Sequence, residues 1–190
     1  MVETRNRVVM VSAGFYPYLI GGAERQALEL SAALVRRGAY VRVLTRRLPR
    51  LSVQEEVRGV QVLRLRRFGS GTVDSLTFMT SLFFWLLRHA SSYDVIHVHL
   101  AGSPALPAAV AGRLLGKRVV IKLGGGRGIG ELAASSQTAA GRLKLRALAW
   151  LKPQFVAVAR ELAEEASRYL GGVPVHIMPN GVDTERFQPA

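Results

Sequence analysis

The chain has 190 residues, of which 49% are hydrophobic and 21% charged; this balance excludes a disordered polypeptide and suits one folded domain. It has no cysteine and only four scattered histidines, so it offers neither disulfides nor a metal-ligand pattern, and we expect no metal site. Basic residues exceed acidic ones by 13, which favours anionic partners without distinguishing a phosphate ligand, an anionic lipid and a nucleic acid.

Apolar runs of strand length alternate with helix-period segments along the first half of the chain. Strands are predicted over residues 7–12, 40–45 and 60–65, and helices over residues 23–37 and 74–89. Asp74 or Ser75 is the expected N-cap of the second helix. A turn is predicted over residues 55–59, and the alternating strand after it suits an edge of the sheet.

The second half continues this alternation, with strands over residues 94–99, 118–123, 154–159 and 173–178 and helices over residues 103–115, 135–150 and 160–170. Parallel strands joined by right-handed crossovers are buried on both faces. The sequence therefore predicts an α/β, Rossmann-like three-layer domain over residues 1–178, with a mostly parallel sheet of about seven strands. Its ligand site is expected at the carboxyl ends of the strands, in residues 13–22, 99–103 and 124–130.

Two glycine-bearing segments lie at these strand ends. Gly21 and Gly22 precede the first helix, whose free N–H groups and positive end attract an anion; an ordinary flexible helix start is the alternative. The second segment, KLGGGRGIGEL, can approach a phosphate or carboxylate closely, although it also suits a mobile connection. Its candidate ligand-binding residues are Lys122, Gly124, Gly125, Gly126 and Arg127.

His97 and His99 share one side of a predicted strand, and His99 reaches its carboxyl end. A hydrogen-bonded core imidazole is favoured for His97, whereas His99 suits either the core or contact with a ligand. The helix over residues 74–89 is too short to span a bilayer. Residues 36–67 hold ten arginines and two acidic residues, so interfacial contact of this region with an anionic membrane is an alternative to simple packing of the helix on the sheet.

Taken together and in order, these motifs resemble glycosyltransferase family 4, a group of retaining GT-B enzymes. The resemblance rests on GGAER at residues 21–25, DVIHVH at residues 94–99 and, most specifically, PNGVDTERFQP at residues 179–189. It implies that residues 179–190 begin an interdomain linker, with a hinge at Asn180 and Gly181, and that the C-terminal donor-binding domain is absent from this chain.

For this half, the resemblance implies acceptor binding along the strand ends, with Tyr16 and His99 among the substrate contacts and Gly21 and Gly22 near the donor diphosphate. The implied reaction moves a sugar from a nucleotide diphosphate sugar to an acceptor hydroxyl with retention, in polysaccharide or glycolipid synthesis, without a required metal or cofactor. Two positions depart from the family pattern: Gly124 stands where a histidine is frequent, and Ala159 where a serine is frequent.

Two other classes compete with this reading. Gly128, Gly130 and Ala133 spell a G-x-G-x-x-A dinucleotide fingerprint, but they follow the fifth strand rather than the first. A module that binds nucleic acid or anionic membrane would use the arginine-rich stretch, which lacks the interleaved aromatics of a single-strand platform; no nucleic acid is therefore expected. The short first apolar run is no signal peptide, so we expect a cytoplasmic protein, peripheral to the inner face of the membrane if it meets lipid.

Overall fold

A computed structural model describes residues 6–17, 21–125, 128 and 130–181. It contains an eight-stranded sheet with the order β3-β4-β2-β1-β5-β6-β7-β8. All neighbouring pairs are parallel except β3 with β4. The strands are β1 Arg7–Ser12, β2 Tyr40–Arg46, β3 Gln54–Val57, β4 Val60–Leu65, β5 Val95–His99, β6 Arg118–Leu123, β7 Gln154–Ala157 and β8 Val175–Ile177.

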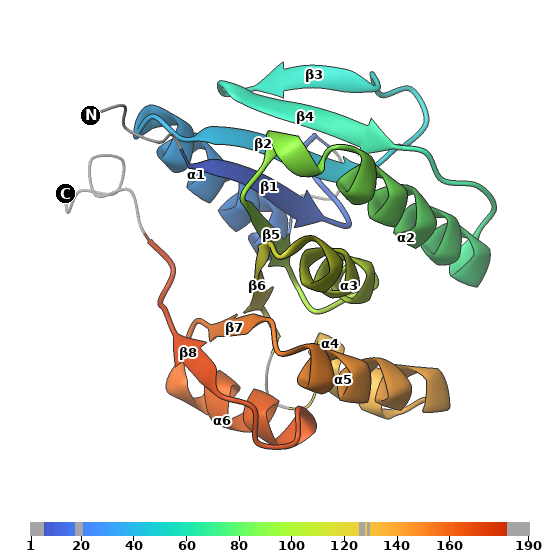
Figure 1. The fold of residues 1–190 in the computed structure, drawn as a ribbon, viewed down its shortest axis with the longest axis vertical. Coiled ribbons are helices and arrows are strands. Elements are labelled where there is room, and N and C mark those ends of the chain that lie inside the picture. Colours follow the sequence, from blue (N-terminus) through green and yellow to red (C-terminus); the bar gives the residue numbers. More distant parts are fainter. Residues whose placement is uncertain (1–5, 18–20, 126–127, 129, 182–190) are drawn as a thin grey trace.

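Helices cover both faces of this sheet, which confirms the Rossmann-like α/β prediction (Figure 1). The α-helices are α1 Gly22–Arg36, α2 Gly71–Arg88, α3 Ala105–Leu115, α4 Glu131–Ser136, α5 Ala139–Leu151 and α6 Arg160–Tyr169, and a short 3-10 turn, η1, spans Ala90–Ser92. The apolar face of α1 packs with one side of β1, β2 and β4. The other side of the sheet packs with α2, α3, α5 and α6.

The predicted edge strand is an inner strand, because a further strand lies outside it. The sequence predicts a turn over residues 55–59, but residues 54–57 form β3, which pairs antiparallel with β4. The connection is the two residues Arg58 and Gly59, whose φ angles of 53° and 79° suit the tight turns that match the twist of a hairpin. The polar composition of β3 hid it, since Gln and Glu are poor indicators of a strand.

Two predicted helices differ from the structure by three residues or more. Helix α2 begins three residues before Asp74, with Ser70 as its N-cap, and Asp74 is buried in the first turn instead of capping it. The helix predicted over residues 135–150 is two helices, because the Thr138 side chain accepts a hydrogen bond from Gly141 N and starts α5 as its N-cap. A side chain at position 141 would collide with the backbone of Ser135, so glycine permits this sharp junction.

Candidate functional site at the strand ends

The carboxyl ends of β1, β5 and β6 lie side by side at the point where the strand order reverses. Chain order runs outward from β1 through β2 to β4 and then returns to β5 on the other side of β1. Ser12 pairs in register with His99, and His99 with Lys122, so the three side chains form a row on one face of the sheet. The structure thus brings the predicted residues His99 and Lys122 together. Ser12 was missed, since a serine that ends a strand carries no distinctive signal.

The two histidines of β5 stack against each other and are held neutral. Their ring centroids are 4.8 Å apart with an interplanar angle of 18°. Burial lowers the pKa of His97 to about 4 and that of His99 to about 2, with the neighbouring cation Lys122 adding to both shifts. Among the described residues, neither buried Nε2 atom has a hydrogen-bond partner. The predicted hydrogen bond of a core His97 is therefore absent at this atom, and His99 offers a neutral imidazole.

Lys122 connects this row to the segment after β8, where the described part of the chain ends. Its Nζ donates to Asn180 Oδ1 at 2.5 Å, and partial burial lowers the pKa of the ammonium group. Asn180 and Gly181, the predicted hinge, are exposed, and residues 182–190 lie outside the described part. The start of the predicted linker thus leaves the domain beside the strand ends.

The start of α1 lies at the same end of the sheet, because it follows β1. Gly21 is the N-cap, and its N–H donates to the side chain of Glu24, three residues on, at 3.0 Å from Oε2. A methyl group on Gly21 would lie 2.6 Å from that oxygen, whereas one on Gly22 would have open space around it as far as the described residues extend. Tyr16, in the preceding loop, is 44% exposed, and its carbonyl accepts a 2.8 Å bond from Arg64. Gly22 is therefore the glycine of the pair where a ligand could reach the backbone without displacing the cap.

The glycine-rich segment after β6 is tied down by Glu131, which sequence reasoning did not single out. Glu131 Oε1 accepts from the backbone N–H groups of Gly124 and Ala101, both at 3.2 Å. A methyl group on Gly125 would lie 2.5 Å from Gly130 Cα, and one on Gly124 would collide with Leu100. These glycines thus have a packing role, and Leu100 fills the space beside Gly124. The predicted residues Gly126 and Arg127 lie outside the described residues.

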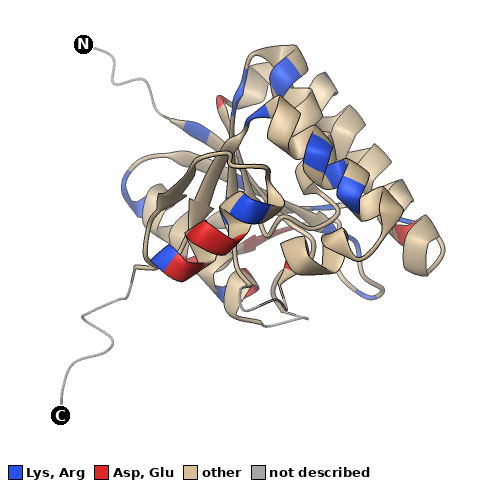
Figure 2. Cartoon of the chain, turned by 90° about the horizontal axis from the view of Figure 1, so that it is seen from below, with Lys and Arg blue, Asp and Glu red and all other residues tan. Residues whose placement is uncertain are grey.

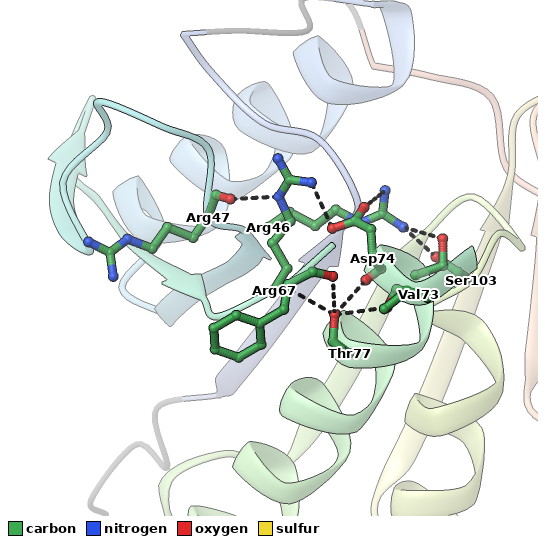
Figure 3. Close-up of polar contacts among 9 residues, drawn as sticks. Arg46, Arg47, Arg67, Val73, Asp74, Thr77 and Ser103 are labelled. Atoms are coloured by element: carbon green, nitrogen blue, oxygen red, sulfur yellow. Dashed lines mark hydrogen bonds and ion pairs between the residues drawn. The ribbon is translucent and has the colours of Figure 1, made fainter. Parts of the chain in front are cut away.

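A second polar cluster connects β2, β4, α2 and the start of α3 (Figure 3). Asp74 pairs with Arg67 at 2.7 Å and with Arg46 at 3.5 Å. Arg46 also donates to Ser103 Oγ at 2.9 Å and lies over the ring of Phe78, 5.1 Å from its centroid. One buried carboxylate therefore holds two guanidinium groups from different strand ends.

The described residues contain no group of three or more metal-ligating side chains. None of their helices has both the length and the apolar character needed to cross a bilayer. The chain has 26 basic and 13 acidic residues, and Figure 2 marks those of the described part in blue and red.

In a comparison with known protein families, the model described as Glycosyltransferase Family 4 matches residues 20–186. This match covers most of the chain. The chain belongs to glycosyltransferase family 4. The family 4 match includes the glycine pair, the histidine strand and most of the terminal motif, and no curated protein matches.

Solved structures share the fold of this family 4 chain at low sequence identity. Sucrose-phosphate synthase from Thermosynechococcus elongatus aligns with a TM-score of 0.68 and 16% identity, over 98% of this chain and 51% of its own. The catalytic domain of starch synthase IV from Arabidopsis thaliana, bound to ADP and acarbose, aligns with a TM-score of 0.61 and 13% identity, over 96% and 53%. WaaG, a glycosyltransferase involved in lipopolysaccharide biosynthesis, aligns with a TM-score of 0.59 and 14% identity, over 94% and 46%. The chain therefore spans about half the length of these proteins and has the fold of the N-terminal half of a GT-B enzyme.

Proposed function

We propose that this chain is the acceptor-binding half of a retaining glycosyltransferase, which moves a sugar from a nucleotide diphosphate sugar to an acceptor hydroxyl in polysaccharide or glycolipid synthesis. Family membership over residues 20–186 is the observation that carries the proposal. The row of Ser12, His99 and Lys122 at the switch in strand order supports it, because ligands of such sheets bind there.

The residues at the strand ends have distinct roles in this proposal. The N–H groups at the start of α1, beside the open Gly22, face the donor diphosphate, where the helix dipole contributes about 0.3–1 kcal/mol. Lys122 adds a positive charge next to His99. A neutral His99 exchanges hydrogen bonds with hydroxyl groups and adds no charge of its own. Binding here needs no metal or cofactor.

A complementary donor-binding domain completes the enzyme in this proposal. The chain spans about half the length of the solved proteins that it matches, and the exposed Asn180 and Gly181 lie at its exit beside Lys122. We therefore expect the missing domain to close over the strand ends, and the 190-residue chain alone to be nearly inactive.

The dinucleotide-binding alternative receives less support. The Gly128 N–H donates to Glu165 at 3.0 Å, and Gly130 packs against Gly125, so the fingerprint positions are engaged within the chain. They also follow β6, whereas the fingerprint belongs after the first strand. Tight saturable binding of NAD(P)H, measured by fluorescence titration, would reverse this ranking.

The test compares the chain alone with the chain complemented by a donor-binding domain of family 4, either fused after residue 190 or supplied as a separate partner. Each is incubated with a panel of nucleotide diphosphate sugars, and release of the nucleoside diphosphate is measured together with sugar incorporation. We expect transfer only with the added domain. Full activity of the chain alone, or no transfer with any donor after the domain is added, contradicts the proposal.

A second arm of the test uses Gly22→Val in the complemented protein. Open space around Gly22 predicts an unchanged unfolding midpoint, whereas the isopropyl group blocks approach of a diphosphate to the N–H groups. We expect a rise in the KM for the donor of roughly tenfold, the equivalent of losing one or two hydrogen bonds. An unchanged KM would show that the donor diphosphate does not bind at the start of α1.

A further inference from the structure

An open hollow lined by arginines lies at the ends of β2 and β4, beside the first turn of α2. Its volume is about 530 Å³, and its lining includes Arg47, Arg50, Arg66 and Arg67 but no acidic residue. Arg67 is paired with Asp74, whereas Arg47, Arg50 and Arg66 are exposed. No ion pair engages these three guanidinium groups among the residues that the structure describes. Guanidinium groups around one hollow suit phosphate-bearing groups, which they can bind bidentately.

An apolar stripe runs along the outer side of α2. Val73, Leu76 and Phe84 are 56%, 55% and 62% exposed, and their helical spacing places them opposite the buried residues Phe78 and Leu82. Three large apolar side chains on one exposed helix face are more than the isolated apolar residues that every protein surface carries.

The hollow and the stripe are parts of one surface. Gly69 lines the hollow, and a methyl group on it would lie 2.9 Å from Val73 Cγ1. Phe68, which is 66% exposed, is anchored by its N–H to Thr77 Oγ1 at 3.0 Å, and Figure 3 shows Thr77 next to Val73 on α2. We call this surface the basic-apolar face; it comprises Arg47, Arg50, Arg66, Phe68, Val73, Leu76 and Phe84.

The helices in the same layer as α2 are also poor in acidic residues. Helices α2, α3 and α5 form one layer on the same side of the sheet (Figure 1). Their sequences contain one acidic residue, Asp74, which is 7% exposed and paired with two arginines. These helices therefore present no carboxylate that would repel an anionic surface.

We propose that the basic-apolar face binds the surface of an anionic lipid bilayer. The arginines of the hollow contact headgroup phosphates, while the apolar side chains of α2 and Phe68 enter the interface beneath the headgroups. Basic and apolar side chains combine in this way on surfaces that lie on membranes without crossing them. The hollow lies at the ends of β2 and β4, and the row lies at the ends of β1, β5 and β6 along the same edge of the sheet. Binding to vesicles without donor or acceptor therefore tests this face separately from the transfer reaction.

The experiment is co-sedimentation of the 190-residue chain with vesicles that contain neither donor nor acceptor. Vesicles of phosphatidylcholine alone are compared with vesicles that also contain phosphatidylglycerol, at low and high salt. We expect binding to the anionic vesicles, weakened by salt. Arg47→Ala combined with Arg66→Ala lowers the partition coefficient roughly 25-fold, from about 1 kcal/mol for each basic residue near an anionic surface. Leu76→Gln combined with Phe84→Gln lowers it at least roughly tenfold, because apolar burial is lost.

The matched control is Arg36→Ala combined with Arg37→Ala. It removes the same charge from exposed positions at the end of α1, on the opposite face of the sheet, and should change binding by less than about twofold. A loss in the control equal to that of the hollow variant overturns the proposal, because net charge alone then explains binding. Absence of binding to anionic vesicles, or full binding by the Leu76 and Phe84 variant, also overturns it.

Self-association is measured on the same samples by size-exclusion chromatography. A dimer that the α2 variant converts to a monomer would assign the basic-apolar face to a second copy of this chain and overturn the membrane proposal. All substituted side chains are exposed, so unfolding midpoints should match the unmodified chain. If a variant does unfold, the lipid and salt dependence of the unmodified chain still decides whether an anionic surface is bound.

Discussion

His97 and His99 show how the burial of a polar side chain sets its chemistry. A lone imidazole in water titrates near pH 6.5, but here burial lowers both pKa values, to about 4 and about 2. Between pH 6.5 and these values the unfolded chain binds more protons than the folded chain. Stability contributed by the neutral histidines is therefore complete above about pH 6.5 and is lost as the pH falls.

This linkage predicts that the free energy of unfolding decreases when the pH is lowered from about 7 to about 5. The slope is up to about 1.4 kcal/mol per histidine for each pH unit below 6.5. Urea unfolding over a pH series measures it. His99→Gln should flatten the dependence, whereas His176→Gln, at an exposed position, should leave it unchanged. Identical pH profiles for the unmodified chain and His99→Gln would show that His99 is not buried in neutral form.

At the scale of the elements, side-chain hydrogen bonds and ion pairs decide where helices and strands meet. Buried Arg64 of β4 donates to the carbonyl groups of Tyr16 and Ser52 and pairs with Glu55 of β3. It thereby fixes the loop after β1 to the edge of the sheet. Asp74 fixes the first turn of α2 in a similar way, because it pairs with Arg46 of β2 and with Arg67, which follows β4.

Asp74→Asn should lower the free energy of unfolding by about 1–3 kcal/mol. The substitution leaves two partly buried guanidinium groups facing each other without a carboxylate, and the loss is smaller than for a fully buried pair because water reaches both arginines. Urea denaturation provides the measurement. The matched control is Glu29→Gln, which breaks the more exposed pair with Arg58 and should cost less than about 1 kcal/mol. Equal effects of the two substitutions would contradict a structural role for the Asp74 cluster.

At the scale of the whole molecule, one sheet serves two apolar clusters. Val9 and Val11 of β1 belong to the cluster with α2 and α3, while Val8 and Met10 belong to the cluster with α1. Neither cluster can lose its packing without exposing β1, so the described domain should behave as one cooperative unit.

Urea unfolding should accordingly give a single transition, with the same midpoint by far-ultraviolet circular dichroism and by tryptophan fluorescence. The fluorescence probe includes Trp85, which packs against the larger cluster. A control with Leu28→Ala, in the α1 cluster, should lower both midpoints together, at a cost of about 2–5 kcal/mol. Separate midpoints for the two probes would show that the clusters unfold independently.

Much of the fold could be predicted from the sequence, because period and length are local properties. Apolar patterning in the sequence predicts the buried strands β1, β2, β5 and β6 and the helices α1 and α3. The polar sequence of β3 does not predict a strand, since this segment becomes a strand only by pairing with β4. The junction at Thr138 was also missed, because it requires a close approach of two backbones at Gly141.

The sequence by itself determined the α/β class, the family motifs and the idea that His99 and Lys122 lie at strand ends. The tertiary structure alone decided their neighbours: it set Ser12 beside His99, bound Glu131 to Gly124 and joined the arginine hollow to the stripe on α2. The physical reason for this division is that the periodicity of apolar residues indicates only which face of a helix or strand a residue occupies. Register, burial and charge pairing arise between segments far apart in the chain, and no local pattern encodes them.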